Sequence, residues 1–360
     1  MAGLFDPLEL RGETLRNRIA VSPMCQYSCD ARDGLATDWH HVHLGSRAVG
    51  GAGLVIAEAT AVEPRGRISP QDLGIWSDEH ADALRDTVAF MKEHGATTGI
   101  QLAHAGRKAS THRPGDGGGP VHGSDGWTPV GPTETPYPHD DPLEVEALDR
   151  EGIEDVKASF RAAAERALDA GFDIAEVHGA HGYLLHEFYS PVSNSRDDEY
   201  GGDFEGRTRL LREVTREVRE VWPDDKPVLV RLSATDWMGE EGWTVDDTAR
   251  LAPLLAEDGA DLIDISAGGI HADQEVPHTG PHYQVPYAER VTEALAEVDC
   301  AVGAVGGITT PEGADEVVRN GRADMTLLAR EHLRDPYFAL HAARELGAEP
   351  PVPRQYTRGF

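Results

Sequence analysis

The stretch Phe172-Asp173-Ile174-Ala175-Glu176-Val177-His178-Gly179-Ala180-His181-Gly182-Tyr183 contains the pattern that decides the fold. Apolar and acidic residues alternate up to Val177, which predicts a short strand over 172–177. Glycines then end the strand, and polar side chains follow. Residues 151–170, just before it, have helical spacing, with Asp149 as a candidate N-cap and Gly171 after the last turn. Residues 149–183 are therefore predicted to form a helix, a turn and a buried strand, with polar groups at the carboxyl end of the strand.

The same alternation continues along the whole chain. Further helix-like segments are 79–94, 207–221, 245–258, 286–297, 311–319 and 331–346. Strand-like segments are 19–22, 53–59, 98–103, 172–177, 228–232, 262–266, 302–305 and 325–328. Eight strands with helices between them, and no second composition regime, indicate an α/β fold of the parallel (β/α)8 TIM-barrel type. We expect one domain over residues 1–360.

Three segments lie outside the repeating pattern. Residues 8–15 have a turn signal at Arg11-Gly12 and predict an N-terminal hairpin that caps the barrel floor. Residues 111–142 are rich in Gly, Pro, Asp and His, and follow the third strand. We interpret them as a lid over the face where barrel active sites form, with a solvated insertion as the alternative. Prolines within 350–353 cannot continue a helix, so residues 347–360 are expected to form an extended C-terminal tail.

Composition restricts the partners and the compartment. The chain has 63 acidic and 33 basic residues and a formal net charge of -30, which disfavours nucleic acid and anionic membranes as partners. No apolar run reaches the roughly 18 residues of a membrane span, and no signal peptide is visible. Three irregularly spaced cysteines fit a reducing compartment, so we expect a cytoplasmic protein. Only four basic residues are lysine. This composition resembles that of proteins from extreme halophiles, although an ordinary acidic protein remains an alternative.

Chemistry in such a barrel collects at the carboxyl ends of the strands. Gly306 and Gly307 follow the seventh predicted strand and offer unhindered backbone N–H groups. Ala329 and Arg330 follow the eighth strand, and Arg330 adds a guanidinium. Neighbouring strand ends of this kind predict a phosphate site, where a simple turn is the alternative.

A phosphate-bearing cofactor would lie across the barrel mouth. Gln101 could hydrogen-bond an amide-rich ring, and Arg231 could offset negative charge on a reduced isoalloxazine. The turn Pro23-Met24-Cys25 would supply an apolar wall beside that ring. For Arg231 the alternative is an ion pair in the barrel core with Glu58 or Asp264. The chain lacks a Gly-x-Gly-x-x-Gly motif after a strand, which argues against a Rossmann site.

Two imidazoles and a phenol stand at the end of the fourth predicted strand. His178 and His181 could hold a carbonyl oxygen, and Tyr183 could transfer a proton. Taken alone, these residues could equally be two polar loop histidines and a packing tyrosine.

The whole chain resembles the old yellow enzymes, FMN-dependent ene-reductases, and in particular the class called thermophilic-like. The segments that carry the resemblance are Ser22-Pro23-Met24-Cys25-Gln26-Tyr27, Asp72-Leu73-Gly74-Ile75-Trp76, Gln101-Leu102-Ala103-His104-Ala105-Gly106-Arg107-Lys108, His178–Tyr183, Ser193-Asn194-Ser195-Arg196, Asp198-Glu199-Tyr200-Gly201-Gly202 and Asn320-Gly321-Arg322-Ala323-Asp324.

The resemblance implies a flavin-dependent alkene reductase. NADPH or NADH would reduce FMN, and the flavin would pass a hydride to an activated alkene, with Tyr183 as proton donor. Substrate would be bound by Tyr27, His178, His181 and Arg358, where Arg358 reaches in from a neighbouring chain of a dimer or tetramer. FMN would be held by Pro23, Met24, Cys25, Ala59, Gln101, Arg231, Gly306, Gly307, Ala329 and Arg330. Cys25 fits this class and need not act as a nucleophile, and no metal is expected.

Three other functions can be weighed against this one. Iron–sulfur relatives with the same barrel need four cysteines for a cluster, and this chain has three. A metal-dependent hydrolase would use His40-His41-Val42-His43 or His178-x-x-His181 as zinc ligands, but the first group is expected to enter a helix. A flavin-binding protein without catalytic activity is the third.

The net charge leads to a test of its own. Like charges repel in dilute buffer, and the Debye length falls to about 3 Å at 1 M salt. The melting temperature should therefore rise steeply from low to molar potassium chloride, as followed by circular dichroism. A flat profile would contradict the halophilic interpretation and leave the enzymatic one unchanged.

Overall fold

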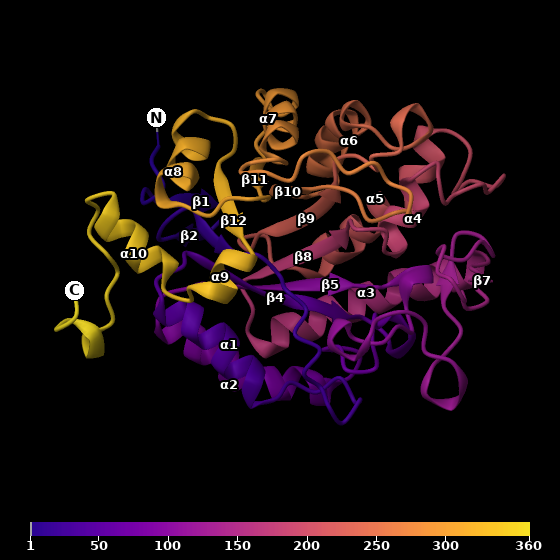
Figure 1. The fold of residues 1–360 in the computed structure, drawn as a ribbon, viewed down its shortest axis with the longest axis horizontal. Coiled ribbons are helices and arrows are strands. Elements are labelled where there is room, and N and C mark those ends of the chain that lie inside the picture. Colours follow the sequence, from indigo (N-terminus) through magenta and orange to yellow (C-terminus); the bar gives the residue numbers. More distant parts are fainter. Residues whose placement is uncertain (1) are drawn as a thin grey trace.

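Eight parallel strands close into a barrel in the computed structural model, which describes residues 2–360 (Figure 1). The barrel strands are β3 (Ile19–Val21), β4 (Leu54–Ala61), β5 (Thr97–Ala103), β8 (Ile174–Gly179), β9 (Val228–Ser233), β10 (Leu262–Ser266), β11 (Ala301–Ala304) and β12 (Met325–Leu328). They are hydrogen-bonded in chain order, and β12 pairs with β3 to close the ring. The expected (β/α)8 fold is confirmed.

Helices follow the strands and surround the barrel. They are α1 (Asp38–Val49), α2 (Asp78–Glu93), α3 (Arg150–Ala170), α4 (Leu184–Tyr189), α5 (Phe204–Val221), α6 (Val245–Glu257), α7 (Val285–Ala294), α8 (Pro311–Arg319), α9 (Arg330–Arg334) and α10 (Phe338–Glu345). Local sequence sets several of their ends. Asp149 caps α3 by accepting the Gly152 N–H, and Gly171 ends the same helix with φ of 98°.

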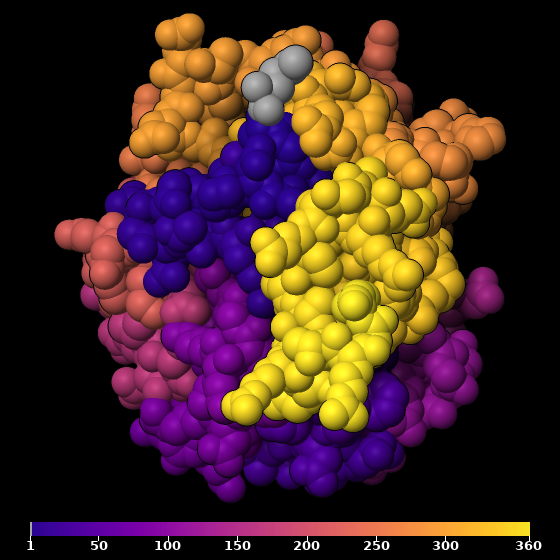
Figure 2. Space-filling view, turned by 90° about the vertical axis from the view of Figure 1, so that its left-hand side faces the viewer, coloured from indigo at the N-terminus to yellow at the C-terminus, as the bar shows by residue number. Residues whose placement is uncertain are grey.

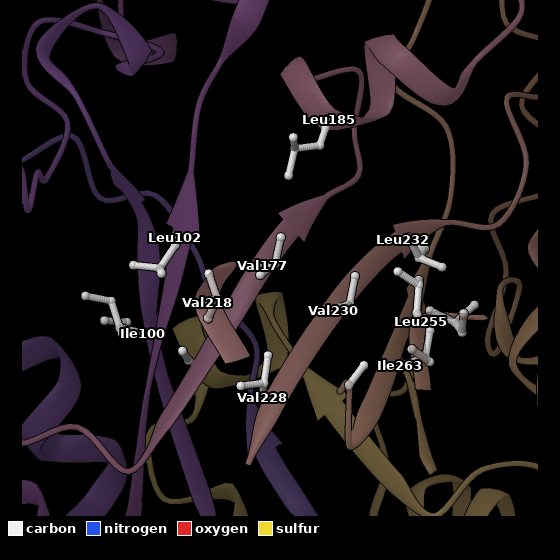
Figure 3. Packing of buried hydrophobic residues seen from close by; sticks show 14 of the residues in the cluster. Ile100, Leu102, Val177, Leu185, Val218, Val228, Val230, Leu232, Leu255 and Ile263 are labelled. Atoms are coloured by element: carbon white, nitrogen blue, oxygen red, sulfur yellow. The ribbon is translucent and has the colours of Figure 1, made fainter. Parts of the chain in front are cut away.

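A layer of apolar side chains joins the strands to the helices around them. In Figure 3, Val177 of β8 and Val230 of β9 lie near Val218 of α5, and Leu255 of α6 lies near Ile263 of β10. These side chains are almost completely buried. Burying one side chain of this size contributes about 1.5–3 kcal/mol, so the layer fixes each strand against its helix.

The hairpin expected near the N-terminus is present. β1 (Leu8–Leu10) pairs antiparallel with β2 (Glu13–Leu15), and Arg11 takes the left-handed conformation that the turn needs. Leu8, Leu10 and Leu15 pack with inward-facing residues of the barrel, such as Leu229. The hairpin therefore closes the floor of the barrel and leaves the opposite end for chemistry.

Two expectations about helices need correction. The segment 331–346 was predicted as one helix but forms α9 and α10, because Pro336 cannot continue the helix that precedes it. Helix α4 was not predicted, since six residues after a glycine-rich turn give too short a pattern to recognise. Helix α4 lies at the active-site end, just after β8, whereas the break at Pro336 contacts Gly50, where α1 ends and the chain turns toward the start of β4.

The irregular segment after β5 is only partly structured. It contains the short strand β6 (Val130–Gly131), which pairs with β7 (Glu146–Ala147), and two 3-10 turns. Its Tyr137 ring lies 4.9 Å from the Lys108 Nζ atom, so this segment reaches the end of the barrel where β8 opens.

The C-terminal tail folds back onto α10. After an irregular stretch, residues Arg354–Tyr356 form a 3-10 turn, and the hydroxyl groups of Tyr356 and Tyr337 lie 3.2 Å apart. In Figure 2 the tail covers the face beside the N-terminal residues. No helix within residues 2–360 has the length and apolar character that crossing a membrane requires.

Candidate active site

A cavity of about 460 Å³ opens at the carboxyl ends of the barrel strands. Its wall brings together six of the residues singled out from the sequence: His181, Arg231, Gly306, Gly307, Ala329 and Arg330. Arg334, Tyr283 and Gln284 are further wall residues that the sequence did not indicate. The wall also contains Glu331, which pairs with Arg334, and Arg231 pairs with Asp264 beneath it. Arg330 has no carboxylate partner within residues 2–360, so its guanidinium group favours an anionic ligand there.

The N–H groups of Gly306, Gly307 and Ala329 form one end of this cavity. Both glycines have positive φ, 114° and 71°. A Cβ atom on Gly306 would lie 2.6 Å from the Gln284 side chain, so only glycine fits. Within residues 2–360 these three N–H groups donate no turn or loop hydrogen bond. Free N–H groups beside the Arg330 guanidinium suit a phosphate.

Arg231 occupies the barrel interior below the cavity. Its Nε atom lies 3.2 Å from Asp264 Oδ2, and its Nη1 atom donates to Ser22 Oγ at 3.0 Å. The ion pair that the sequence left open is thus formed with Asp264, whereas Glu58 accepts the Gln26 N–H. Arg231 still lines the cavity, so it can serve both roles.

Gln101 is oriented by a buried carboxyl group. Its Nε2 atom donates to Glu176 Oε1 at 2.7 Å, and its amide oxygen has no hydrogen-bond partner within residues 2–360, so it remains available as an acceptor. Burial, followed by the neighbouring Asp264, raises the pKa of Glu176. Glu176 lies in the same strand as His178. It was not recognised as a site residue, because an acidic residue in a strand where apolar and acidic residues alternate is an ordinary member of that pattern.

His178, His181 and Tyr183 form one contiguous group of rings. The His178 ring lies 5.2 Å from that of His181 and 5.2 Å from that of Tyr183, both in edge-to-face geometry. His181 is also within 2.7 Å of Ser266 Oγ. Among the described residues, His178 Nδ1 is buried without a hydrogen-bond partner. The structure therefore assembles the expected trio and leaves a polar atom to be satisfied.

Burial keeps all three groups neutral. It lowers the pKa of His178 and of His181 well below the usual range, and Arg231 adds to both shifts. Burial also raises the pKa of Tyr183 well above its usual value. At neutral pH the site thus offers neutral imidazole groups and a phenol that keeps its proton.

Lys108 is a member of this site to which the sequence gave no role. Its Nζ atom donates to the carbonyl oxygens of His181 and Gly269, at 2.8 and 2.9 Å, and lies 5.1 Å from the Tyr183 ring. Burial lowers its pKa to about 8, against the opposing effect of Glu187. In the sequence, only its position in the segment just after β5 indicated that Lys108 could belong to the site. A single lysine at such a position does not form a motif that predicts a function.

The remaining predicted residues lie around the barrel mouth outside the cavity wall. Pro23, Met24, Cys25 and Tyr27 follow β3 and are partly buried, and Ala59 is in β4. Ala59 and Tyr183 line a smaller hollow together. Burial raises the pKa of the Cys25 thiol well above its usual value, which opposes a nucleophilic thiolate. Arg358 is exposed on the tail and lines no part of this cavity.

The histidines considered as zinc ligands have separate partners. His40 contacts Glu58 and Thr37, and His41 contacts Thr87. Across residues 2–360, no three or more His, Cys, Asp or Glu side chains gather in a metal-binding group. This geometry gives the hydrolase alternative no observation in its favour.

Comparisons with known proteins agree with this geometry. Residues 3–349 match the NADH:flavin oxidoreductase / NADH oxidase family. An NADPH dehydrogenase of Geobacillus sp. (strain WCH70) is 49% identical over 362 residues, covering 99% of this chain and 98% of the relative. An NADPH dehydrogenase of Bacillus subtilis (strain 168) is 46% identical, with 99% of each chain covered.

Solved structures give the same result. Morphinone reductase superposes with a TM-score of 0.77 at 26% identity, over 97% of this chain and 90% of its own. A mutant of that enzyme in complex with tetrahydroNAD gives 0.77 at 25% identity, over 99% and 94%. The expected relationship to the old yellow enzymes is confirmed, with FMN as cofactor and NAD(P)H as reductant. The chain belongs to the NADH:flavin oxidoreductase / NADH oxidase family and is an NAD(P)H-dependent flavin oxidoreductase.

Proposed function

We propose that this enzyme reduces the C=C bond of α,β-unsaturated carbonyl compounds and related activated alkenes. The observation that carries the proposal is the group of three neutral rings, His178, His181 and Tyr183, beside a cavity that also contains Arg231. Two imidazoles can hold one oxygen atom, and a phenol can supply one proton. A site built only to store flavin has no need of this set.

The residues present fit FMN. Its phosphate suits the free N–H groups of Gly306, Gly307 and Ala329 together with Arg330. Its ring suits the free amide oxygen of Gln101 and the guanidinium of Arg231. Pro23, Met24, Cys25 and Ala59 complete the set at the mouth of the barrel. When bound, FMN supplies the two-electron chemistry that connects NADPH or NADH to the alkene.

His178 and His181 act on the carbonyl oxygen of the substrate. Each neutral imidazole can donate one N–H, and these bonds strengthen as negative charge develops on the oxygen. Fixed donors in a buried site need little reorganisation during reaction, so they favour the transition state over the bound substrate. Tyr27, at the rim, helps to bind the substrate.

Tyr183 donates the proton to the α-carbon. Its raised pKa means that the phenol is protonated before the reaction begins. The Lys108 ammonium 5.1 Å from its ring favours the phenolate left after transfer. Water then restores the proton.

Assembly contributes to the substrate pocket in this proposal. Arg358 is exposed on the tail and lines no part of its own chain's cavity, so a role in substrate binding would place it at the site of another chain. We propose a dimer or tetramer in which Arg358 borders the neighbour's substrate. Residues 111–142 act as a lid, since Tyr137 already contacts Lys108. Each chain of this assembly is one flavin-binding domain, residues 1–360, of a cytoplasmic enzyme.

The phosphate cradle can be tested through a glycine. Gly306→Ala should weaken FMN binding by about tenfold or more, because a strained left-handed residue costs about 1–3 kcal/mol and its Cβ strikes Gln284. Titration of the apoprotein, followed by flavin fluorescence, measures the change. Gly321→Ala is the matched control: Gly321 also has positive φ but an open surrounding. Equal losses in both variants would contradict the assignment of the cradle.

The catalytic roles can be distinguished by measuring the two half-reactions, flavin reduction by NADPH and alkene reduction by the reduced flavin. Tyr183→Phe should slow alkene reduction by about 10²-fold or more and change flavin reduction by NADPH much less. His178→Ala and His181→Ala should weaken phenol binding and slow alkene reduction, each by a few kcal/mol of transition-state stabilisation. Stopped-flow absorbance with 2-cyclohexen-1-one measures both steps. An equal loss of both steps in Tyr183→Phe refutes the proton-donor role, and FMN-loaded wild type without turnover would indicate a non-catalytic flavoprotein.

The tail provides the test of assembly. Arg358→Ala should raise KM for the alkene while oligomeric mass and FMN content stay unchanged. Deletion of residues 354–360 should also weaken assembly, as measured by light scattering. If the truncated chain keeps both its mass and its kinetics, the shared site is wrong.

A further inference from the structure

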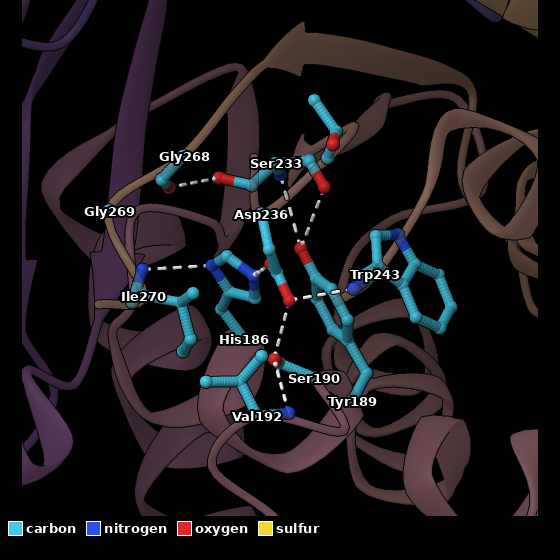
Figure 4. A network of polar contacts seen from close by, with 12 residues as sticks. His186, Tyr189, Ser190, Val192, Ser233, Asp236, Trp243, Gly268, Gly269 and Ile270 are labelled. Atoms are coloured by element: carbon cyan, nitrogen blue, oxygen red, sulfur yellow. Dashed lines mark hydrogen bonds and ion pairs between the residues drawn. The ribbon is translucent and has the colours of Figure 1, made fainter. Parts of the chain in front are cut away.

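His186 and Asp236 form a fully buried pair (Figure 4). His186 belongs to α4, directly after the loop that carries His181 and Tyr183, and Asp236 follows β9. The two side chains have no exposed surface. Neither residue lines the cavity, so the pair cannot touch the substrate.

The hydrogen bonds define the state of this pair. His186 Nδ1 accepts the Gly182 N–H at 2.8 Å, so the ring proton lies on Nε2, which donates to Asp236 Oδ1 at 2.7 Å. The other carboxylate oxygen, Oδ2, accepts from Ser190 Oγ at 2.6 Å and from the backbone N–H of Trp243 at 2.8 Å. With three donors from two segments, α4 with its C-cap residue and the loop that carries Trp243, Asp236 is a fixed anchor for one tautomer of His186.

The loop held by this pair has an uncommon backbone. His181 and Gly182 both have positive φ, 62° and 73°, and a Cβ on Gly182 would overlap the Gly269 carbonyl. Such a conformation persists only where the surroundings enforce it. Ser233 Oγ accepts the His181 N–H at 2.9 Å, and Lys108 holds the His181 carbonyl. The bond from Gly182 to His186 holds the other end of that same peptide group, its N–H.

That peptide group lies between two residues of the proposed chemistry. Gly182 connects His181, which binds the carbonyl oxygen, to Tyr183, which donates the proton. If this N–H loses its acceptor, a buried donor is left unpaired, and only the Lys108 bond to the His181 carbonyl still restrains rotation of the peptide group. Rotation at Gly182 changes the separation of the two side chains directly, and a misplacement of about 1 Å can cost about 10²-fold in rate.

We propose that His186 and Asp236 are positioning residues for alkene reduction. Asp236 selects the tautomer of His186, and His186 fixes Gly182 and so the spacing of the oxygen-binding and proton-donating groups. This inference rests on the proposed function for its catalytic consequence. Its structural part, the hold on Gly182, can be measured without any substrate.

Two substitutions of His186 separate positioning from packing. His186→Asn places an amide oxygen where Nδ1 lies and keeps an acceptor for Gly182. His186→Phe keeps the ring volume and the stacking on Tyr189, 4.6 Å away, but has no acceptor. His43→Phe is the matched control, because His43 is a buried histidine on α1 whose ring makes no hydrogen bond within residues 2–360.

The first readout is amide hydrogen exchange in the proteolytic fragment that contains Gly182. It is measured by mass spectrometry on the FMN-loaded and FMN-free proteins. Exchange should be faster in His186→Phe and Asp236→Asn, and close to wild type in His186→Asn and His43→Phe. If His186→Phe exchanges like wild type, or His186→Asn like His186→Phe, the pair only fills space and the proposal is overturned. Should His186→Phe fail to fold, Asp236→Asn decides: wild-type exchange there overturns it equally.

The second readout is stopped-flow kinetics with NADPH and 2-cyclohexen-1-one at equal FMN content. His186→Phe should slow alkene reduction by about 10- to 100-fold, with a smaller change in flavin reduction, and His186→Asn should recover most of the loss. A greater loss in His186→Asn than in His186→Phe would overturn the positioning role. If no variant, wild type included, reduces an enone while the exchange pattern is as expected, the hold on Gly182 stands and the proposed function fails.

Discussion

Closure of eight parallel strands into one barrel is the constraint on which the rest of the structure depends. Because every barrel strand pairs in parallel with its neighbours, and β12 pairs with β3, all eight strands point the same way and every carboxyl end reaches one rim. Residues as distant in sequence as Ser22 and Arg231 thereby come within 3.0 Å of each other. The hairpin β1–β2 fills the opposite end, so the open rim is the one that can accept a large ligand.

Charge is distributed unevenly over this frame. The surface carries an excess of acid, whereas the cavity wall contains Arg231, Arg330 and Arg334. A phosphate-bearing cofactor is attracted to this region, where the Arg330 guanidinium group and the free N–H groups meet. A short distance away, burial removes charge instead: His178, His181 and Tyr183 are neutral at physiological pH because each charged form would be poorly solvated. One half of the site thus recognises charge, and the other responds to charge that develops during reaction.

The reactive side chains depend on a second layer of polar contacts. Tyr189 and Ser233 join β8 to β9 through the Tyr189 hydroxyl, which donates to the Gly179 carbonyl and accepts from the Ser233 N–H. Ser233 then holds His181, and the pair His186–Asp236 holds Gly182. The hydrogen bonds of Tyr189, His186 and Asp236 (Figure 4) lie within the low-dielectric interior, where polar groups are costly to leave unpaired and geometry is well defined.

Sequence alone determined the barrel, its strand order and the residues at the strand ends. This was possible because alternating apolar runs and helical spacing are local patterns, and the carboxyl ends of parallel strands necessarily meet. Residues such as His178, Gly306 and Arg330 could therefore be placed on one rim before any coordinates. Local rules also set the ends of α3, through Asp149 and Gly171.

Only the tertiary structure decided which partners these residues have. It paired Arg231 with Asp264 rather than Glu58, turned Gln101 toward Glu176, brought Lys108 to Tyr183, and placed the His186–Asp236 pair behind Gly182. Each of these contacts joins residues from different strands or loops. Several side chains of the chain have the right chemical type to pair with the same buried group. Spacing along the chain carries no information on that choice, because it is set by the distances and angles between elements once the barrel has closed.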